Sequence, residues 1–378
     1  MSLSGDHCHM SLLGFAKRTR VGRRVMSLKA ATAPHVGVLR HSLRQEPDHY
    51  DRLLPRDRAV ALFKRHVELI EVETTSYCNR TCSFCPNSSI DRRSEKVIMP
   101  EACWDNILRD LHDCDYDGSF FWCRYSEPLS ERRIIERIAE VRRAAPQSHI
   151  CIDSNGDYLD GAFLAELVAA GLDYLLVDLY MPDADTYDLD AARDYHERFL
   201  ERIGASATIQ TTVPELSSRI DAIGIQVIVV VRNSASMQRG MSNRGGLVTH
   251  ARRTQRVAPC YAPSRHLVID WDGSVVACCQ VRSDVAQHRD AVVAQVGVNG
   301  VGLIEAYAAL AHWRDALRAF GPKTGPCATC TVAEYPMTWL TRTAVGTLTG
   351  ESTLGVRAAK RAAGAVVRKA RHWHGPGS

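Results

Sequence analysis

Ser76-Tyr-Cys-Asn-Arg-Thr-Cys-Ser-Phe-Cys-Pro86 is the stretch of this 378-residue sequence that says most about its fold and chemistry. It places three cysteines, Cys78, Cys82 and Cys85, at C-x3-C-x2-C spacing. A loop this short can bring its three thiolates together around one soft metal centre. Four irons with three protein thiolates leave one iron open, and an open iron indicates chemistry rather than simple electron transfer.

A zinc site is the main alternative for these three cysteines. Zinc knuckles favour Cys-x2-Cys pairs with a fourth Cys or His at close spacing, and no such residue lies close to Cys85. The spacing and its context resemble the radical S-adenosylmethionine (SAM) superfamily, in which a 4Fe–4S cluster chelates SAM through its open iron. The resemblance also implies that Phe84 lies near the adenine of SAM.

The segments around this loop alternate between strand-like and helix-like patterns. Residues 67–74 are strand-like and lead directly into the loop. Further strands are predicted at 119–123, 149–153, 173–178, 207–212 and 226–231, and helices at 100–112, 131–145, 160–170 and 185–203. Repeated βα units imply a parallel sheet with right-handed crossovers. About six such units predict an α/β fold, an open partial (β/α)6 barrel with functional groups at the carboxyl ends of its strands.

A second group of four cysteines lies far along the chain, at Cys260, Cys278, Cys327 and Cys330. Four thiolates suit a closed cluster without an open iron, although structural zinc also binds four cysteines. Their arrangement resembles the auxiliary-cluster module called Twitch, a shortened form of the SPASM module. Beside a radical SAM loop, we expect a second 4Fe–4S cluster here. A further auxiliary cluster is not expected, because no cysteine follows Cys330.

These patterns divide the chain into four parts. We expect a basic N-terminal extension at 1–66, a radical SAM partial barrel at 67–232, a small cysteine-rich auxiliary-cluster domain at 233–340, and a basic C-terminal tail at 341–378. Inside the third part, residues 267–277 are predicted to form a hairpin that turns at Asp272-Gly273. Residues 303–320 are predicted to be helical.

Charge and cysteine usage narrow the class of protein. The net charge of +4 is unevenly distributed along the chain. Residues 1–66 contain 13 Lys/Arg against 5 Asp/Glu, and residues 341–378 contain 7 against 1. The centre of the chain is therefore acidic. An acidic folded centre argues against nucleic-acid binding. The longest β-branched run is too short to cross a bilayer, and the N-terminus lacks a signal-peptide layout. Thirteen cysteines, several at metal-like spacing, favour a reducing cytoplasm.

Two polar motifs follow later strands of the predicted barrel. Glu127 resembles the family's acidic residue that binds the SAM ammonium, a charge-assisted contact, although Ser126 replaces the usual glycine. Ser154 and Asn155 are candidates for hydrogen bonds to the ribose hydroxyls or the carboxylate of SAM. An ordinary loop glutamate and an Asx-Gly turn without function are the alternatives.

Met241-Ser-Asn-Arg-Gly-Gly246 lies between the barrel and the second cysteine group. Together with the motifs above, it narrows the resemblance to radical SAM dehydrogenases that act on aminocyclitols and sugars, over residues 67–335. In those enzymes the matching arginine faces the substrate, so Arg244 is the candidate substrate residue. The alternative is that Arg244 is an arginine in a surface turn without contact to substrate. Because arginine stays protonated, we expect Arg244 to stabilise developing oxyanion charge.

Several functions are compatible with these motifs. The resemblance implies a dehydrogenase in which a 5′-deoxyadenosyl radical removes hydrogen from a secondary alcohol and the auxiliary cluster accepts the second electron. An epimerase would use a thiol as hydrogen donor, and Cys279 is the candidate. It follows the expected cluster ligand Cys278, and neighbouring strand residues point to opposite faces, so both cannot easily bind the same cluster. A peptide-modifying enzyme ranks third, since residues 1–66 lack an evident leader-binding pattern. A non-enzymatic electron carrier or zinc-stabilised scaffold is the fourth possibility.

The dehydrogenase hypothesis brings its own cofactors and partners. It requires two 4Fe–4S clusters, SAM, a small sugar or aminocyclitol as substrate, and an electron donor such as flavodoxin or ferredoxin. The remaining cysteines of the barrel have a simpler explanation. They fall on or beside predicted helices and strands, and we expect them to be buried as small apolar side chains: Cys103, Cys114, Cys123 and Cys151.

Overall fold

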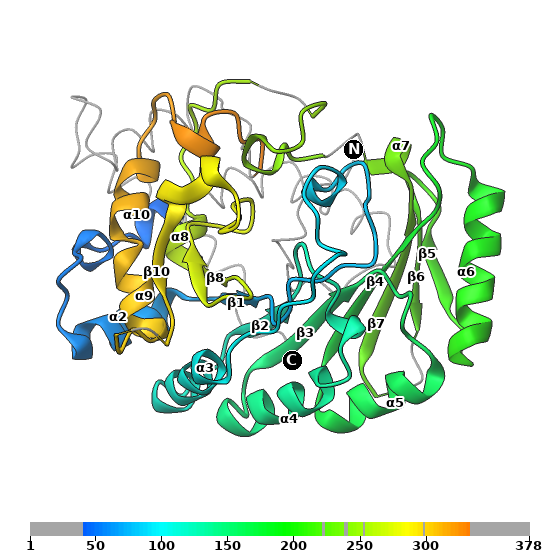
Figure 1. The fold of residues 1–378 in the computed structure, drawn as a ribbon, viewed down its shortest axis with the longest axis horizontal. Helices are drawn as coiled ribbons and strands as arrows, with labels where there is room; N and C mark the ends of the chain where they lie inside the picture. Colours follow the sequence, from blue (N-terminus) through cyan, green and yellow to red (C-terminus); the bar gives the residue numbers. More distant parts are fainter. Residues whose placement is uncertain (1–40, 221–223, 238–240, 252–253, 298, 333–378) are drawn as a thin grey trace, which may run out of the picture.

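The computed structural model describes residues 41–220, 224–237, 241–251, 254–297 and 299–332 (Figure 1). They are built around a 10-stranded sheet with the order β10-β9-β8-β1-β2-β3-β4-β7-β6-β5. The strands at the middle of the sheet are parallel: β8 (His266–Ile269), β1 (Leu69–Val72), β2 (Ser119–Trp122), β3 (His149–Ser154), β4 (Tyr174–Tyr180) and β7 (Gln226–Arg232). The outer strands are antiparallel: β9 (Ser274–Val276), β10 (Val292–Gln295), β6 (Leu216–Ile220) and β5 (Thr208–Thr211).

Helices connect the parallel strands, and α3, α4 and α5 lie next to one another along one face of the sheet (Figure 1). The α-helices are α2 (Arg56–His66), α3 (Glu101–Asp113), α4 (Ile134–Ala144), α5 (Gly161–Ala170), α6 (Leu189–Ile203), α7 (Ser234–Met237), α8 (Ala262–Arg265), α9 (Leu303–Ala309) and α10 (Ala311–Arg318). Helix α5 begins where the Asp160 carboxylate accepts a hydrogen bond from the Phe163 amide, and it ends at Gly171, with φ +104°. The predicted α/β class with a mostly parallel sheet is confirmed.

The sixth parallel strand is not the one that the sequence predicts. Strand β5 lies in the segment expected to continue the parallel run, yet it pairs antiparallel with β6. Residues 212–215 are too few for a crossover connection, so the chain turns back as a hairpin. Strand β8 takes the parallel position instead, with Ile70 opposite Leu267.

Strand β8 places the cysteine-rich part of the chain on the same sheet as the barrel. The predicted 267–277 hairpin is confirmed, since Val268 pairs with Val276 and the Asp270 amide donates to Ser274 O at 2.8 Å. Gly273 adopts φ +85° at the turn, a backbone conformation that favours glycine. The predicted 303–320 helix is instead two helices, α9 and α10, that meet at Leu310.

The two faces of the parallel strands bury different side chains. On the face toward the helices, Ile70, Phe120 and Trp122 are fully buried in the main apolar core. The other face carries a smaller apolar cluster that includes Cys151, Leu176 and Val230. In β3, β4 and β7 the next residue on that face is polar, as alternation along a strand requires: Asp153, Asp178 and Arg232. This second face of the sheet, which we call the inner face of the barrel, therefore becomes charged toward the carboxyl ends of the strands. The cysteines expected to be buried are at most 7% exposed: Cys103, Cys114, Cys123 and Cys151.

Residues 41–66, which the sequence groups with the N-terminal extension, pack against the later part of the chain. Helix α2 lies beside α9 (Figure 1), with the rings of Phe63 and Tyr307 in edge contact at 5.6 Å. The four domain boundaries stay predictions, and residues 1–40 and the tail at 341–378 fall outside the described ranges. Within those ranges, no helix is long and apolar enough to span a membrane.

Candidate functional site

The loop after β1 holds Cys78, Cys82 and Cys85 in one partly buried group. Its backbone is folded on itself, since the Cys85 amide donates to Cys82 O at 2.9 Å. Burial raises the pKa of Cys78 and of Cys82 to about 12, and the neighbouring thiols of the loop push in the same direction. Thiolates in such a place need a compensating cation, and a metal centre supplies one. The donor set therefore fits an iron–sulfur cluster.

Arg80 anchors this cysteine loop to the ends of β3 and β4. Its Nε and Nη2 both donate to the Asp157 carboxylate at 2.6 Å, and its Nη1 donates to Tyr180 O at 3.0 Å. Asn79 also donates to Asp157, at 2.6 Å. Although burial opposes the change, these hydrogen bonds and the Arg80 charge lower the pKa of Asp157. Phe84 completes the contact, with its ring 5.1 Å from that of Tyr180.

Glu127, Ser154 and Asn155 form one hydrogen-bond network with the cysteine loop. The Glu127 carboxylate accepts from the Leu129 amide at 2.9 Å, the Ser154 hydroxyl at 2.7 Å and the Asn155 amide at 2.8 Å. The Asn155 side-chain amide donates to Asn79 Oδ1 at 2.8 Å. Burial raises the pKa of Glu127 to about 7. The three candidate SAM residues are thus brought together.

Glu127 has a structural task that the sequence does not reveal. Its side chain is 2% exposed, and three of its acceptor positions bind groups of the protein. Those bonds join the loop after β2 to the loop after β3. Contact between its carboxylate and the SAM ammonium stays a prediction, as do the SAM contacts of Phe84, Ser154 and Asn155.

Arg244 lies in a 3-10 turn, η5 (Arg244–Gly246), where it adopts φ +47°. Its guanidinium is 5.8 Å from the centre of the Tyr125 ring. Although burial opposes the change, the nearby Tyr125, Cys85 and Tyr180 raise the pKa of Arg244. Among the described residues, no carboxylate lies within ion-pair distance of this guanidinium. Arg244 therefore places a positive charge close to Cys85 of the cysteine loop.

A buried ionic network next to Arg244 was missed by the sequence analysis. The Glu73 carboxylate accepts from the amides of Tyr125 at 2.8 Å and Ser126 at 2.6 Å. Its other oxygen lies 3.8 Å from Arg124, which is ion-paired with Asp270. Arg124 lies two residues after the end of the buried strand β2 and adopts φ +91°. The sequence signal that could have indicated this network is a charged residue at the end of a buried strand.

The second cysteine group comes together from three segments. Cys260 precedes α8, Cys278 follows β9, and Cys327 and Cys330 lie at the 3-10 turn η7 (Gly325–Cys327). Burial raises the pKa of Cys278, and the three other thiols add to the increase because they lie close by. A cluster, in which each thiolate binds a different iron, fits this donor set.

Cys279, the candidate hydrogen donor, is 5% exposed and belongs to the main apolar core. Its Sγ accepts a hydrogen bond from Gln280 Nε2 at 3.5 Å, and its carbonyl accepts one from the Tyr125 hydroxyl at 3.1 Å. Its catalytic role stays a prediction.

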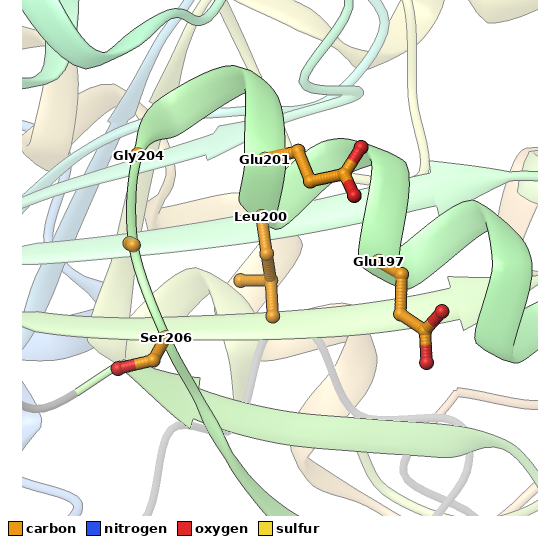
Figure 2. A pocket seen from close by; sticks show the side chains of 6 residues that line it. Glu197, Leu200, Glu201, Gly204 and Ser206 are labelled. Atoms are coloured by element: carbon orange, nitrogen blue, oxygen red, sulfur yellow. The ribbon is translucent and has the colours of Figure 1, made fainter.

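The surface pocket in Figure 2 is separate from these residues. It lies at the end of α6 and in the loop that follows, and is lined by Glu197, Leu200, Glu201, Gly204, Ala205 and Ser206. None of these is a candidate site residue.

Comparison with known families agrees with both cysteine groups. The radical SAM superfamily model matches residues 72–213, which include the first group. The model of an iron–sulfur cluster-binding domain, SPASM, matches residues 260–331, which include all four cysteines of the second. The chain therefore contains a radical SAM domain and an iron–sulfur cluster-binding domain. The expected 4Fe–4S and SAM cofactors, and further iron–sulfur binding in the second domain, are confirmed by these matches.

Individual relatives share a substantial part of the chain. The S-adenosyl-L-methionine-dependent 2-deoxy-scyllo-inosamine dehydrogenase of Niallia circulans is 25% identical over 211 residues, 56% of this chain and 72% of that protein. The structure of BtrN in complex with AdoMet and 2-DOIA is 23% identical with a TM-score of 0.47, over 66% of this chain and 87% of that one. Streptococcus suis SuiB bound to precursor peptide SuiA is 12% identical with a TM-score of 0.35, over 74% of each chain. The domain matches and the dehydrogenase relative confirm the expected class, a radical SAM oxidoreductase.

Replacing Asp157 should loosen the cysteine loop. Asp157→Asn removes the charge-assisted bonds to Arg80, and we expect a loss of about 1.5–3 kcal/mol in the free energy of unfolding. Iron content after anaerobic reconstitution should fall with it. Glu166→Gln is the control, because the Arg132–Glu166 pair is exposed and contributes about 1 kcal/mol or less. Equal stability and iron content in the two variants would contradict the anchoring role.

Glu71 should make stability depend on pH. Burial raises its pKa from 4.5 to about 7, so between these values the folded protein holds a proton that the unfolded chain releases. This group should therefore lower the free energy of unfolding as pH rises through that window, by about 3 kcal/mol in total. Glu71→Gln should remove this decline in anaerobic urea unfolding at a series of pH values. The same pH dependence in both proteins would be the contrary result.

Proposed function

We propose that this protein oxidises a secondary alcohol of a small sugar or aminocyclitol by radical SAM chemistry. Cys78, Cys82 and Cys85 would hold the cluster that binds SAM. Cys260, Cys278, Cys327 and Cys330 would hold an auxiliary 4Fe–4S cluster that accepts the second electron. One observation carries the proposal: the segment with Arg244 contacts the surroundings of both cysteine groups.

That segment reaches the second cysteine group through Asn243. The fully buried Asn243 amide donates to the carbonyl of Thr329 at 3.0 Å and to its hydroxyl at 2.6 Å. Thr329 lies between Cys327 and Cys330 in the sequence, and turns η5 and η7 are in contact. On its other side, Arg244 lies close enough to Cys85 for their charges to interact. A substrate held at Arg244 would therefore have one cysteine group on each side.

The chain's own residues supply recognition and electrostatics at this position. When bound, the first cluster and SAM supply a 5′-deoxyadenosyl radical, which is chemistry of the cofactor. Arg244 stays protonated and can donate to a substrate oxygen, which stabilises negative charge that develops on that oxygen. Such a donor matters most in a site that excludes water, where the effective dielectric is low.

The inner face of the barrel favours a polar substrate. Asp178 and Arg232 face one another there at 3.3 Å, and the buried Asp178 Oδ1 has no hydrogen-bond partner within the described residues. A buried acceptor without a partner is costly, and a hydroxyl or ammonium group of a ligand would satisfy it. A sugar or aminocyclitol carries several such groups. The named substrate of the Niallia circulans relative is of the same chemical class.

Anaerobic turnover with candidate sugars and aminocyclitols tests the reaction. We expect 5′-deoxyadenosine together with a product lighter than the substrate by two hydrogens, detected by mass spectrometry. The Cys78→Ala/Cys82→Ala/Cys85→Ala variant should form neither. A product of unchanged mass in water, with inverted stereochemistry and carbon-bound deuterium in deuterium oxide, would overturn the proposal in favour of an epimerase.

Arg244 variants test the substrate contact separately. Arg244→Gln should lower kcat/KM for dehydrogenation by about 100- to 1,000-fold, because the site loses a charged donor at the developing oxyanion. Arg244→Lys keeps the charge but lacks the planar guanidinium, so its kcat/KM should lie between those of the unaltered enzyme and Arg244→Gln. Both should still bind iron as the unaltered protein does. Arg198→Gln is the control, since Arg198 is exposed and also lies over a tyrosine ring, 4.9 Å from the centre of Tyr195. Equal kcat/KM values for Arg244→Gln and this control would exclude the contact.

A further inference from the structure

Arg256 is a buried arginine beside the second cysteine group, four residues before Cys260 in the sequence. It is 2% exposed, which is unusual for a side chain that is always charged. The dehydrogenase proposal gives it no role. A buried guanidinium is retained at a cost in desolvation, so its contacts show what it organises.

The Arg256 guanidinium joins the two chain segments that carry three of the four cysteines. Toward the first segment, its Nε donates to Ala258 O at 3.1 Å and its Nη2 to Pro259 O at 2.7 Å. Toward the second, its Nη1 donates to Cys330 O at 3.3 Å and to Val332 O at 2.6 Å. Pro259 directly precedes Cys260. One planar group therefore sets the separation of Cys260 from Cys330.

The backbone of Arg256 is held by the same region. Its amide donates to Ala328 O at 2.7 Å, and its carbonyl accepts from the Lys323 amide at 3.0 Å. Ala328 lies between Cys327 and Cys330. Arg256 is consequently fixed to the Cys327–Cys330 segment by main chain and side chain together, which limits the movement of its charge.

The charge of Arg256 lies beside the second cysteine group, because its Nη1 donates to the carbonyl of Cys330 itself at 3.3 Å. The four acceptors named above are neutral carbonyls, and their hydrogen bonds hold the guanidinium in place. A cation held beside the cysteines in a poorly hydrated place favours any added negative charge there.

We propose that Arg256 is a positioning residue for the auxiliary iron–sulfur centre, which it serves in two ways. Its hydrogen bonds fix the Cys260 and Cys330 segments at the separation that the centre requires. Its charge favours the reduced form, which carries one more negative charge, and so raises the reduction potential. The inference rests on the proposed function, in which this centre takes up an electron from the substrate.

A redox titration tests both effects without using substrate turnover. The full-length Cys78→Ala/Cys82→Ala/Cys85→Ala protein, reconstituted anaerobically, retains only the second centre, whose midpoint potential is followed by electron paramagnetic resonance. Adding Arg256→Gln should lower the potential and speed the loss of iron to a chelator. Adding Arg256→Lys should keep the potential near that of the parent, while iron is still lost faster because the fork is absent.

Arg142→Gln provides a matched control for the loss of a bridging arginine. Arg142 also joins carbonyl oxygens of separate segments, at Ser148 and at Gly171, both 2.8 Å away, but on the α4 side of the barrel. Its replacement should leave the potential and the iron retention of the second centre unchanged. The inference is overturned if Arg256→Gln behaves like this control, or if Arg142→Gln shifts the potential equally.

Failure of the dehydrogenase proposal would be recognised separately. A lower potential in Arg256→Gln, with no dehydrogenated product from the unaltered enzyme, supports the role of Arg256 and excludes the reaction. Product formation by the unaltered enzyme, with unchanged potential and iron retention in Arg256→Gln, excludes the role of Arg256 alone.

Discussion

The buried ion pair between Arg124 and Asp270 is the constraint on which the rest of the site depends. It joins the end of β2 to the end of β8, while Glu73, at the end of β1, lies 3.8 Å from the same arginine. Breaking such a pair leaves an uncompensated buried charge, a loss of about 3–5 kcal/mol. The three strands must therefore keep their register. Because the cysteine loop starts directly after Glu73, its position relative to the C-terminal cysteines follows from this register.

A second set of buried charges reinforces the same connection. Arg282, after β9, donates to Asn87 Oδ1 at 2.9 Å, and its partner Asp284 lies 3.2 Å from Arg92 of the cysteine loop region. These contacts span almost 200 positions in the sequence. The radical SAM and cluster-binding regions thus share both a sheet and a polar interface. The proposed passage of an electron from a substrate at Arg244 to the second centre requires such a fixed arrangement.

The sequence predicted those features that have local signals. The C-x3-C-x2-C spacing indicated the cluster loop, and strand and helix periodicity located most of the barrel. The placement of β8 beside β1 could not be predicted, because pairing between distant segments leaves no pattern in either one. The partners of Glu127 and Arg124 could not be predicted for the same reason. Their residue types indicated charge at strand ends, but the choice between binding a ligand and binding the protein depends on the three-dimensional contacts.

Iron and sulfide analysis of anaerobically purified protein tests the central claim, that the two cysteine groups hold two separate clusters. The unaltered protein should contain about eight irons per chain, and the Cys78→Ala/Cys82→Ala/Cys85→Ala variant about four. The iron that remains in the variant should give the spectrum of a 4Fe–4S cluster. A folded variant that holds no iron, or holds zinc at the second group, would contradict the account.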